Sequence, residues 1–235
     1  MRLNKFLSGA GIASRRKCDE IILGGEVTVN GKVVDSLGVI VNEKKDVVKY
    51  RGEIVSLPQS FVYIKLNKPK GYVCSASDDK SRPTIYQLIN TTERLFSVGR
   101  LDYDTEGLIL LTNDGEFANA VAHPRGEIEK EYKVSVEGKI LESELAVLRK
   151  GVVVDGDRMP PAGVKLLSFD GKVSKISVII HEGQNRQVRR MFEAIGKSIK
   201  LLKRVRIGEV KLGGLKRGDY RDLTTQELDS LVRVK

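Results

Sequence analysis

The run from Gly107 to Leu111 constrains the fold more than any other segment of this sequence. It reads Gly-Leu-Ile-Leu-Leu, it follows a polar segment that contains Asp102, and it is followed by Asn113-Asp114-Gly115. A short apolar run between turn-forming residues predicts a strand that is buried on both faces. We therefore expect a sheet with cover on both sides, which a chain of 235 residues is long enough to build.

The other predicted elements are mixed in order along the chain. Strands are predicted over 61–66, 132–136, 151–154, 175–180 and 198–207, and helices over 116–122, where Pro124 should end the helix, over 186–195, and from the capping box Thr224–Glu227 onward. No regular strand–helix alternation links them. The fold class expected is α+β, with a mixed, mainly antiparallel central sheet flanked by helices.

The first 34 residues predict a small module of two helices and a hairpin. Apolar residues at helical spacing mark one helix over 3–10, and Ser14 is a suitable N-cap for a second helix whose apolar face holds Cys18, Ile21 and Ile22. Asn30-Gly31 between two β-rich segments predicts a tight hairpin. Cys18 and Cys74 are far apart and match neither a zinc site nor a disulfide framework.

Positive charge is concentrated in two places. The net charge is +10, and residues 182–217 contain 11 Lys and Arg against 3 Asp and Glu. Arg15, Arg16 and Lys17 begin the second predicted helix, where cations oppose the helix dipole. A phosphate backbone at these positions would explain both clusters, so a nucleic-acid partner is favoured over a merely solvated surface.

Several function classes have no support in the sequence. No apolar run approaches the roughly 20 residues of a membrane span, and the N-terminus does not resemble a signal peptide, so we expect a cytoplasmic protein without a membrane partner. Glycine-rich nucleotide-binding motifs and HExxH are missing, so neither a nucleotide cofactor nor a metal is expected.

Three segments together resemble the RsuA/RluB branch of ribosomal RNA pseudouridine synthases. They are the GRLD segment at 98–115, EKEYKV at 129–134, and EGQNRQVRRMF with the following residues at 182–196. The N-terminal module is similar to an S4 RNA-binding domain. The resemblance implies an S4-like domain over 1–48 and a catalytic domain over 61–235, acting as a monomer without a cofactor. Residues 49–60 are expected to be a linker, because Pro58 breaks regular structure and the polar pair Gln59-Ser60 precedes a predicted strand.

The resemblance also implies roles for individual residues. Asp102 is expected to be the catalytic carboxylate, with its action as nucleophile or base left open. Arg189 is expected to be its buried partner cation, and Tyr132 to lie against the flipped uracil. Supporting or RNA-binding roles fall to the remaining cations, Arg100, Lys130, Arg186, Arg190, Arg15, Arg16 and Lys17.

The implied function is conversion of uridine to pseudouridine in ribosomal RNA, which requires the target base to leave its helix. Large-subunit (23S) RNA is favoured because the NRQVRRM version of the third segment, at 185–191, is closer to the RluB side. Two alternatives stay open: a synthase for small-subunit (16S) RNA, and a non-catalytic RNA-binding assembly factor that uses the same basic surfaces.

Overall fold

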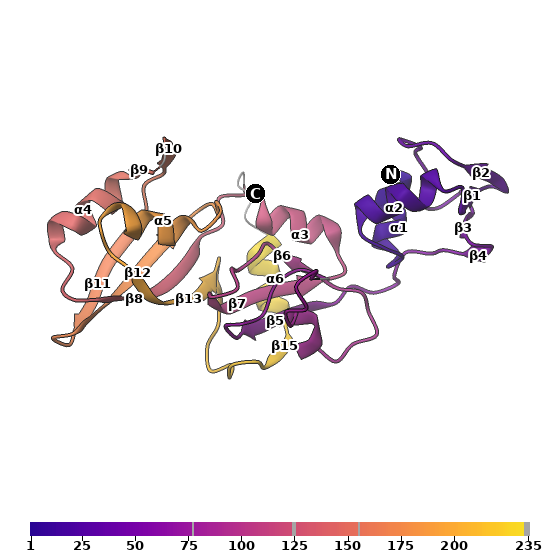
Figure 1. Cartoon of the computed structure of the whole chain (residues 1–235). Coiled ribbons are helices and arrows are strands. Elements are labelled where there is room, and N and C mark those ends of the chain that lie inside the picture. Colours follow the sequence, from indigo (N-terminus) through magenta and orange to yellow (C-terminus); the bar gives the residue numbers. More distant parts are fainter. Residues whose placement is uncertain (77, 124–125, 155, 233–235) are drawn as a thin grey trace. The chain divides into compact units, whose positions relative to one another are not determined.

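Figure 1 shows the computed structural model of the chain, which describes residues 1–76, 78–123, 126–154 and 156–232. Pro124, predicted to end a helix, lies outside these residues. The chain forms two compact units. The N-terminal unit comprises 1–62 together with 91–95 and 113–115, and the C-terminal unit comprises 63–90, 96–112 and 116–235.

The N-terminal unit packs two helices against a small antiparallel sheet. Helices α1 (Leu3–Gly9) and α2 (Arg15–Leu23) precede a sheet of order β2-β1-β3-β4, whose strands are β1 (Val27–Val29), β2 (Lys32–Val34), β3 (Val48–Tyr50) and β4 (Glu53–Ile54). The Ser14 hydroxyl accepts a hydrogen bond from the Lys17 N–H, and Cys18, Ile21 and Ile22 are buried. Asn30 and Gly31 both have positive φ, as the predicted hairpin turn requires.

The predicted linker over 49–60 is wrong in its first half. Residues 49–54 complete β3 and form β4, and β3 pairs with β1 through Lys49 and Tyr50. Arg51 and Gly52 turn the chain with positive φ, as Asn30 and Gly31 do in the first hairpin. The hairpin was not predicted because most residues of its two strands are not buried, so the segment lacks the apolar pattern of a strand.

A nine-stranded sheet forms the C-terminal unit. The seven strands on its main path follow the order β11-β12-β8-β13-β7-β5-β15, with β14 paired to β13 and β6 paired to β7. Their bounds are β5 (Tyr63–Lys68), β6 (Phe96–Val98), β7 (Glu106–Thr112), β8 (Lys130–Glu137), β11 (Gly163–Phe169), β12 (Val173–Ile180), β13 (Ile199–Ile207), β14 (Val210–Lys211) and β15 (Tyr220–Asp222). Of the described strand pairs in this sheet, only β13 and β7 run parallel, which confirms the mixed, mainly antiparallel prediction.

Helices cover the sheet, and a separate hairpin lies beside one of them. The helical elements are η1 (Ile85–Leu88), α3 (Gly115–Ala122), α4 (Glu142–Lys150), α5 (Gln187–Ala194) and α6 (Thr225–Val232), and the hairpin consists of β9 (Val152–Val154) and β10 (Asp157–Met159). All seven residues of β7 are buried, as its sequence predicts. Leu108 and Leu110 of β7 pack with Phe117 and Val121 of α3 and with Leu231 of α6.

Helix α4 and strand β11 are among the elements of this unit that were not predicted. Helix α4 buries only Leu145 and Leu148, which is too short an apolar pattern to reveal a helix. Strand β11 leaves most of its residues exposed and contains an irregularity between Leu166 and Ser168, so its alternation is broken.

Gly107 allows a close approach between strands β7 and β13. Its φ is +109°, and a Cβ atom placed on it would lie 2.2 Å from the carbonyl oxygen of Arg204 in the neighbouring strand β13. No side chain fits at that distance, so the parallel β7–β13 pairing depends on glycine here.

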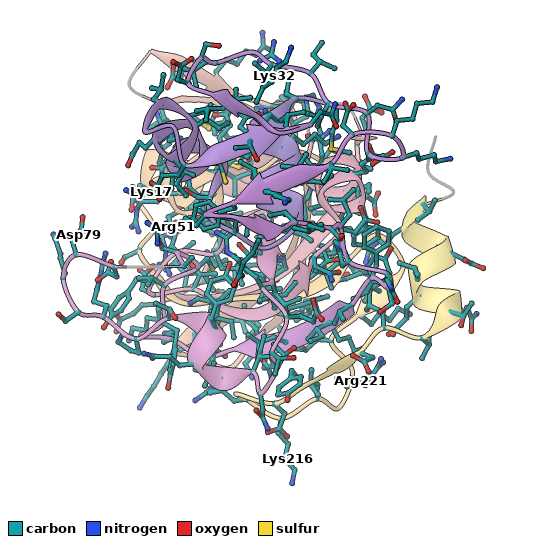
Figure 2. The ribbon with its side chains drawn as sticks, turned by 90° about the vertical axis from the view of Figure 1, so that its right-hand side faces the viewer. Lys17, Lys32, Arg51, Asp79, Lys216 and Arg221 are labelled. Atoms are coloured by element: carbon teal, nitrogen blue, oxygen red, sulfur yellow. The ribbon has the colours of Figure 1, made fainter. Side chains whose placement is uncertain are left out.

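Helix α6 is fixed by a cluster of charges around Glu227. Lys65 donates to its carboxylate at 2.9 Å, and Arg221, labelled in Figure 2, donates to both of its oxygens at 2.8 and 2.9 Å. The predicted capping box is confirmed, because the Thr224 N–H donates to Glu227 and the Glu227 N–H donates to the Thr224 hydroxyl. Burial by itself would raise the pKa of Glu227, but these partners outweigh it and lower the pKa to about 2.

Glu227→Gln is expected to weaken the protein in a pH-dependent way. Because folding lowers the pKa of Glu227, its ionised form stabilises the fold fully above its ordinary pKa, and this contribution is lost as the pH falls from about 4.5 to about 2. Urea unfolding should show a loss of about 1–2 kcal/mol at pH 7 that shrinks below pH 4.5. Glu209→Gln, at an exposed position, is the control, and an unchanged difference between the two variants down to pH 2.5 would contradict this account.

Candidate active site

A cavity of about 450 Å³ lies in the C-terminal unit. Its walls come from the segment between β6 and β7, from the starts of β8 and α5, from the end of β12, and from β13. Among the predicted site residues it brings together Asp102, Tyr132, Lys130, Arg100 and Arg186. A cavity of this size on a rigid sheet, lined by several polar groups, is the usual setting of a ligand site.

Two buried side chains, Lys68 and Cys74, form hydrogen bonds to the backbone of the loop that carries Asp102. The Lys68 ammonium is fully buried and donates to the carbonyls of Asp102, Thr105 and Pro69 at 3.0, 2.7 and 3.1 Å. The Cys74 thiol donates to the Leu101 carbonyl at 3.3 Å and accepts from the Leu101 N–H at 3.4 Å. Burial raises the pKa of Cys74, so the group remains a thiol that can donate. These contacts fix the backbone on both sides of Asp102.

Neither Lys68 nor Cys74 was identified from the sequence. Lys68 was placed in a turn, but it is the last residue of β5, and burial lowers its pKa despite the nearby carboxylates of Asp102 and Asp104. A lysine directly before a proline gives no local signal of burial. Its role follows from the long-range pairing of β5 with β7.

Lys68→Met should destabilise the protein and disturb the Asp102 loop. Methionine fills a similar volume but removes the ammonium that donates to three carbonyl oxygens, of which that of Asp102 still accepts from the Thr105 N–H at 3.1 Å. We expect this loss to cost about 2 kcal/mol of unfolding free energy. If the loop then moves, turnover should fall more than RNA affinity does. Lys70→Met, at an exposed position two residues away, is the matched control for thermal and chemical unfolding. Equal stability of the two variants would show that Lys68 does not hold the loop.

Arg189 does not pair with Asp102 as the resemblance implied. Its guanidinium forms an ion pair with the Asp104 carboxylate at 3.0 Å and also donates to the Asp104 carbonyl at 3.2 Å. Asp104 lies two residues further along the same turn, and its side chain meets α5. The described residues that line the cavity include Asp102 but not Arg189. Arg189 is thus a buried cation beside the Asp102 loop, with Asp104 as its partner.

Tyr132, Lys130 and Arg204 lie on the two central strands of the cavity. Tyr132 pairs in register with Arg204 across β8 and β13, and all three side chains are buried. Lys130 donates to the His181 carbonyl at 3.0 Å. Burial, helped by the positive charge of Arg204 and opposed by Glu182, lowers the pKa of Lys130 to about 8. Arg204 was not singled out from the sequence, where it is one of several cations in an alternating strand.

Segment 182–187 forms another wall of the cavity. The buried Gln187 side chain accepts from the Gln184 N–H at 3.1 Å and donates to the Glu182 carboxylate at 3.3 Å. Arg186 has φ +49° and is exposed at the cavity, with its guanidinium 3.7 Å from the Asp104 carboxylate. Arg100 is also exposed where it lines the cavity. These two arginines are accessible to a phosphate.

Arg190 is engaged by the protein itself. It donates to the Val154 carbonyl at 3.2 Å and to the Asp157 carboxylate at 3.3 Å, and so connects α5 to the β9–β10 hairpin. This placement does not favour the predicted RNA contact. Sequence reasoning missed the partner, because the hairpin precedes Arg190 by more than 30 residues.

The N-terminal cluster of cations is on the surface. Arg15, Arg16 and Lys17 are all exposed, and Lys17, labelled in Figure 2, forms an ion pair with Glu20 at 2.6 Å. The first turn of α2 contains no acidic residue. Positive potential therefore remains at this helix end for an anionic partner.

The arrangement suits chemistry on a single nucleobase held beside a carboxylate. Asp102 provides a nucleophile or base, Tyr132 an aromatic side chain, and Lys130 and Arg204 buried positive charge. Within the described ranges, no three His, Cys, Asp or Glu side chains are grouped so that they could hold a metal ion, and no helix is long and apolar enough to cross a membrane.

Comparison with known proteins gives matches over the whole chain. The family model described as RNA pseudouridylate synthase matches residues 62–194, and the model described as S4 domain matches residues 1–48. The ribosomal large subunit pseudouridine synthase B of Bacillus subtilis is 47% identical over 233 residues, which cover 98% of this chain and 95% of that protein. An uncharacterized RNA pseudouridine synthase of Aquifex aeolicus is 44% identical over 236 residues, which cover 100% of this chain and 94% of that protein.

A solved structure supports the same assignment. The crystal structure of a pseudouridylate synthase superimposes with a TM-score of 0.71 at 34% sequence identity, and covers 98% of this chain and 99% of that one.

Proposed function

Because the chain belongs to the RNA pseudouridylate synthase family, in its RsuA/RluB-like branch, we propose that it converts a specific uridine of large-subunit ribosomal RNA to pseudouridine. The chain is a pseudouridine synthase that acts on RNA. The choice of ribosomal RNA, and of its large subunit, is supported by the relative from Bacillus subtilis, whose name specifies the ribosomal large subunit and which aligns over 95% of its length.

Asp102 is the residue to which we assign the central role in this reaction. The C1′–N1 bond of uridine breaks, the base turns, and C5 bonds to C1′. The C5 proton leaves and N1 takes up a proton, so the product is an isomer of the substrate. A carboxylate beside C1′ can act as nucleophile or base in these steps. The observation that carries the proposal is that Asp102 and Tyr132 line one cavity, while Lys68 and Cys74 fix the Asp102 loop.

The remaining residues have supporting roles in this proposal. Tyr132 lies against the uracil ring, since stacking of a base on an aromatic side chain contributes about 1–3 kcal/mol. Arg189 acts on the Asp102 loop through Asp104 rather than by direct pairing. Arg100 and Arg186 contact the RNA backbone near the flipped nucleotide, and Arg15, Arg16 and Lys17 contact it through the S4 domain.

Release of tritium tests this proposal directly. The C5 hydrogen of uridine leaves for water only when C5 bonds to C1′, so transcripts labelled with [5-³H]uridine report the reaction. Large-subunit and small-subunit transcripts would be assayed separately, followed by the corresponding subunit particles. We expect about one equivalent of tritium per large-subunit molecule, and reverse transcription of carbodiimide-treated product should map one site.

The other outcomes identify the alternatives. Release from small-subunit RNA alone would make the chain a small-subunit synthase. Tight binding to ribosomal RNA without release from any substrate would favour a non-catalytic assembly factor.

A further inference from the structure

Two cations, Lys130 and Arg204, are buried in the wall of the cavity. Neither takes part in the proposed steps that involve Asp102 and Tyr132. Lys130 is 8% exposed and Arg204 is 4% exposed. They stand on the adjacent strands β8 and β13, and both line the cavity together with Tyr132. Placing two like charges in one buried site is unfavourable without a compensating partner.

Hydrogen bonds within the described residues leave donors of both cations unused. Lys130 gives one of its three N–H bonds to the His181 carbonyl. Arg204 gives Nε–H to the Leu108 carbonyl at 2.7 Å, but its Nη2 is buried without a partner in the part of the chain that the structure describes. Buried donors are nearly always satisfied in proteins. The unused donors therefore indicate an acceptor that arrives with the ligand.

The mutual repulsion of the two cations has the same implication. Burial and the charge of Arg204 both lower the pKa of Lys130, while Glu182 partly offsets them. An electronegative atom between the two side chains would relieve this repulsion. Lysine and arginine side chains only donate, so the site would accept a carbonyl oxygen and reject an amino group.

We propose that Lys130 and Arg204 together bind O4 of the flipped uracil and thereby select uridine over cytidine. This inference rests on the proposed function. C4 lies opposite N1 in the pyrimidine ring, so with C1′ held at Asp102 the O4 atom is the part of the base furthest from the bond that breaks. Uracil has a carbonyl oxygen at this position, whereas cytosine has an amino group that donates.

The same contact would assist the first chemical step. When the C1′–N1 bond breaks, its electron pair stays with the base and is delocalised over N1, O2 and O4. Fixed cationic donors in a site shielded from water stabilise such developing charge. Lys130 and Arg204 are thus specificity-determining residues that also favour departure of the base.

A substrate and enzyme double-substitution cycle tests this inference. The probe is a synthetic RNA that contains the mapped target uridine, its 4-thio analogue or its 2-thio analogue, because sulfur accepts hydrogen bonds more weakly than oxygen. Single-turnover rates would be measured for the wild type and for Lys130→Met. Lys133→Met, at an exposed position on the same strand, is the matched control. Thermal melting and RNA binding would establish that each variant is folded, and Lys130→Gln would replace Lys130→Met if the latter is not.

We expect the effects of the enzyme substitution and the sulfur substitution on the rate to be non-additive only when the sulfur is at position 4 of the uracil. Lys130→Met should slow uridine conversion about 10- to 100-fold, the range for a hydrogen bond to a charged group, with RNA affinity changed less than about twofold. The 4-thio substitution should slow the wild type about 10-fold but slow Lys130→Met by less than about threefold. The 2-thio substitution should slow both enzymes equally, and Lys133→Met should behave as the wild type does.

Independent losses from the 4-thio substitution and from Lys130→Met would overturn the inference while leaving an active synthase. Coupling to the 2-thio position would overturn it as well. A folded wild-type enzyme that forms no product on any RNA would overturn the proposed function, and this inference with it.

Discussion

Replacing Asp102 by asparagine is expected to abolish pseudouridine formation while the protein still binds RNA. Asparagine has the same shape, so the contacts of Lys68 with the Asp102 and Thr105 carbonyls, which involve only the main chain, should persist. The amide is neither a nucleophile nor a base at neutral pH. Loss of such a group should reduce the single-turnover rate about 10³-fold or more, with RNA affinity changed less than about twofold.

The measurement is tritium release under single-turnover conditions, combined with filter binding of the same RNA. Asp79→Asn is the matched control, because Asp79, labelled in Figure 2, is exposed on the same unit. Wild-type turnover by Asp102→Asn would remove Asp102 from the mechanism. A parallel loss of RNA affinity would show that its main contribution is to binding.

Gly107→Ala should produce the largest loss of stability of any substitution considered for this chain. The added Cβ would lie 2.2 Å from the Arg204 carbonyl oxygen and 2.8 Å from its nitrogen, both of which are backbone atoms in the central sheet. Backbone atoms in a sheet cannot move aside as the end of a flexible side chain can. In addition, a φ of +109° is strained for alanine. We expect the free energy of unfolding to fall by about 3–4 kcal/mol.

Gly213→Ala separates the two causes of this loss. Gly213 also has a positive φ, +61°, but a Cβ there would meet nothing within 4 Å. When both variants are unfolded in urea, Gly213→Ala should lose only the conformational part of the unfolding free energy, about 1–2 kcal/mol. Equal losses for the two variants would show that the strands separate easily at Gly107.

The features that could be predicted from the sequence are those encoded by neighbouring residues. Ser14, Asn30-Gly31 and the capping box at Thr224 are short signals whose partners lie within a few positions, and each forms as expected. The buried strand β7 follows from an unbroken apolar run. Each of these depends on local geometry, which the pattern of residue types records.

The features that were missed depend on distant pairing. Lys68 becomes important because β5 lies beside β7, and Arg204 because β13 brings it beside Tyr132. The partner of Arg189 depends on whether the Asp102 or the Asp104 side chain points toward α5. The GRLD motif fixes the order of these residues in the chain but not the direction of their side chains. In each case the residue type was visible, but its neighbours were not.

The parallel pairing of β7 with β13 also dictates when during synthesis the protein can become functional. Asp102 precedes β7, whereas Arg204 lies about 100 residues later, so the ribosome makes one wall of the cavity well before the other. Contacts between residues so far apart in the chain form late and slowly. A nascent chain that ends after α5 already contains Asp102, Tyr132 and Arg189, yet it lacks the strand that joins the two halves of the sheet. The enzyme should therefore remain inactive toward RNA until β13 has emerged and folded, however early its most recognisable motifs are translated.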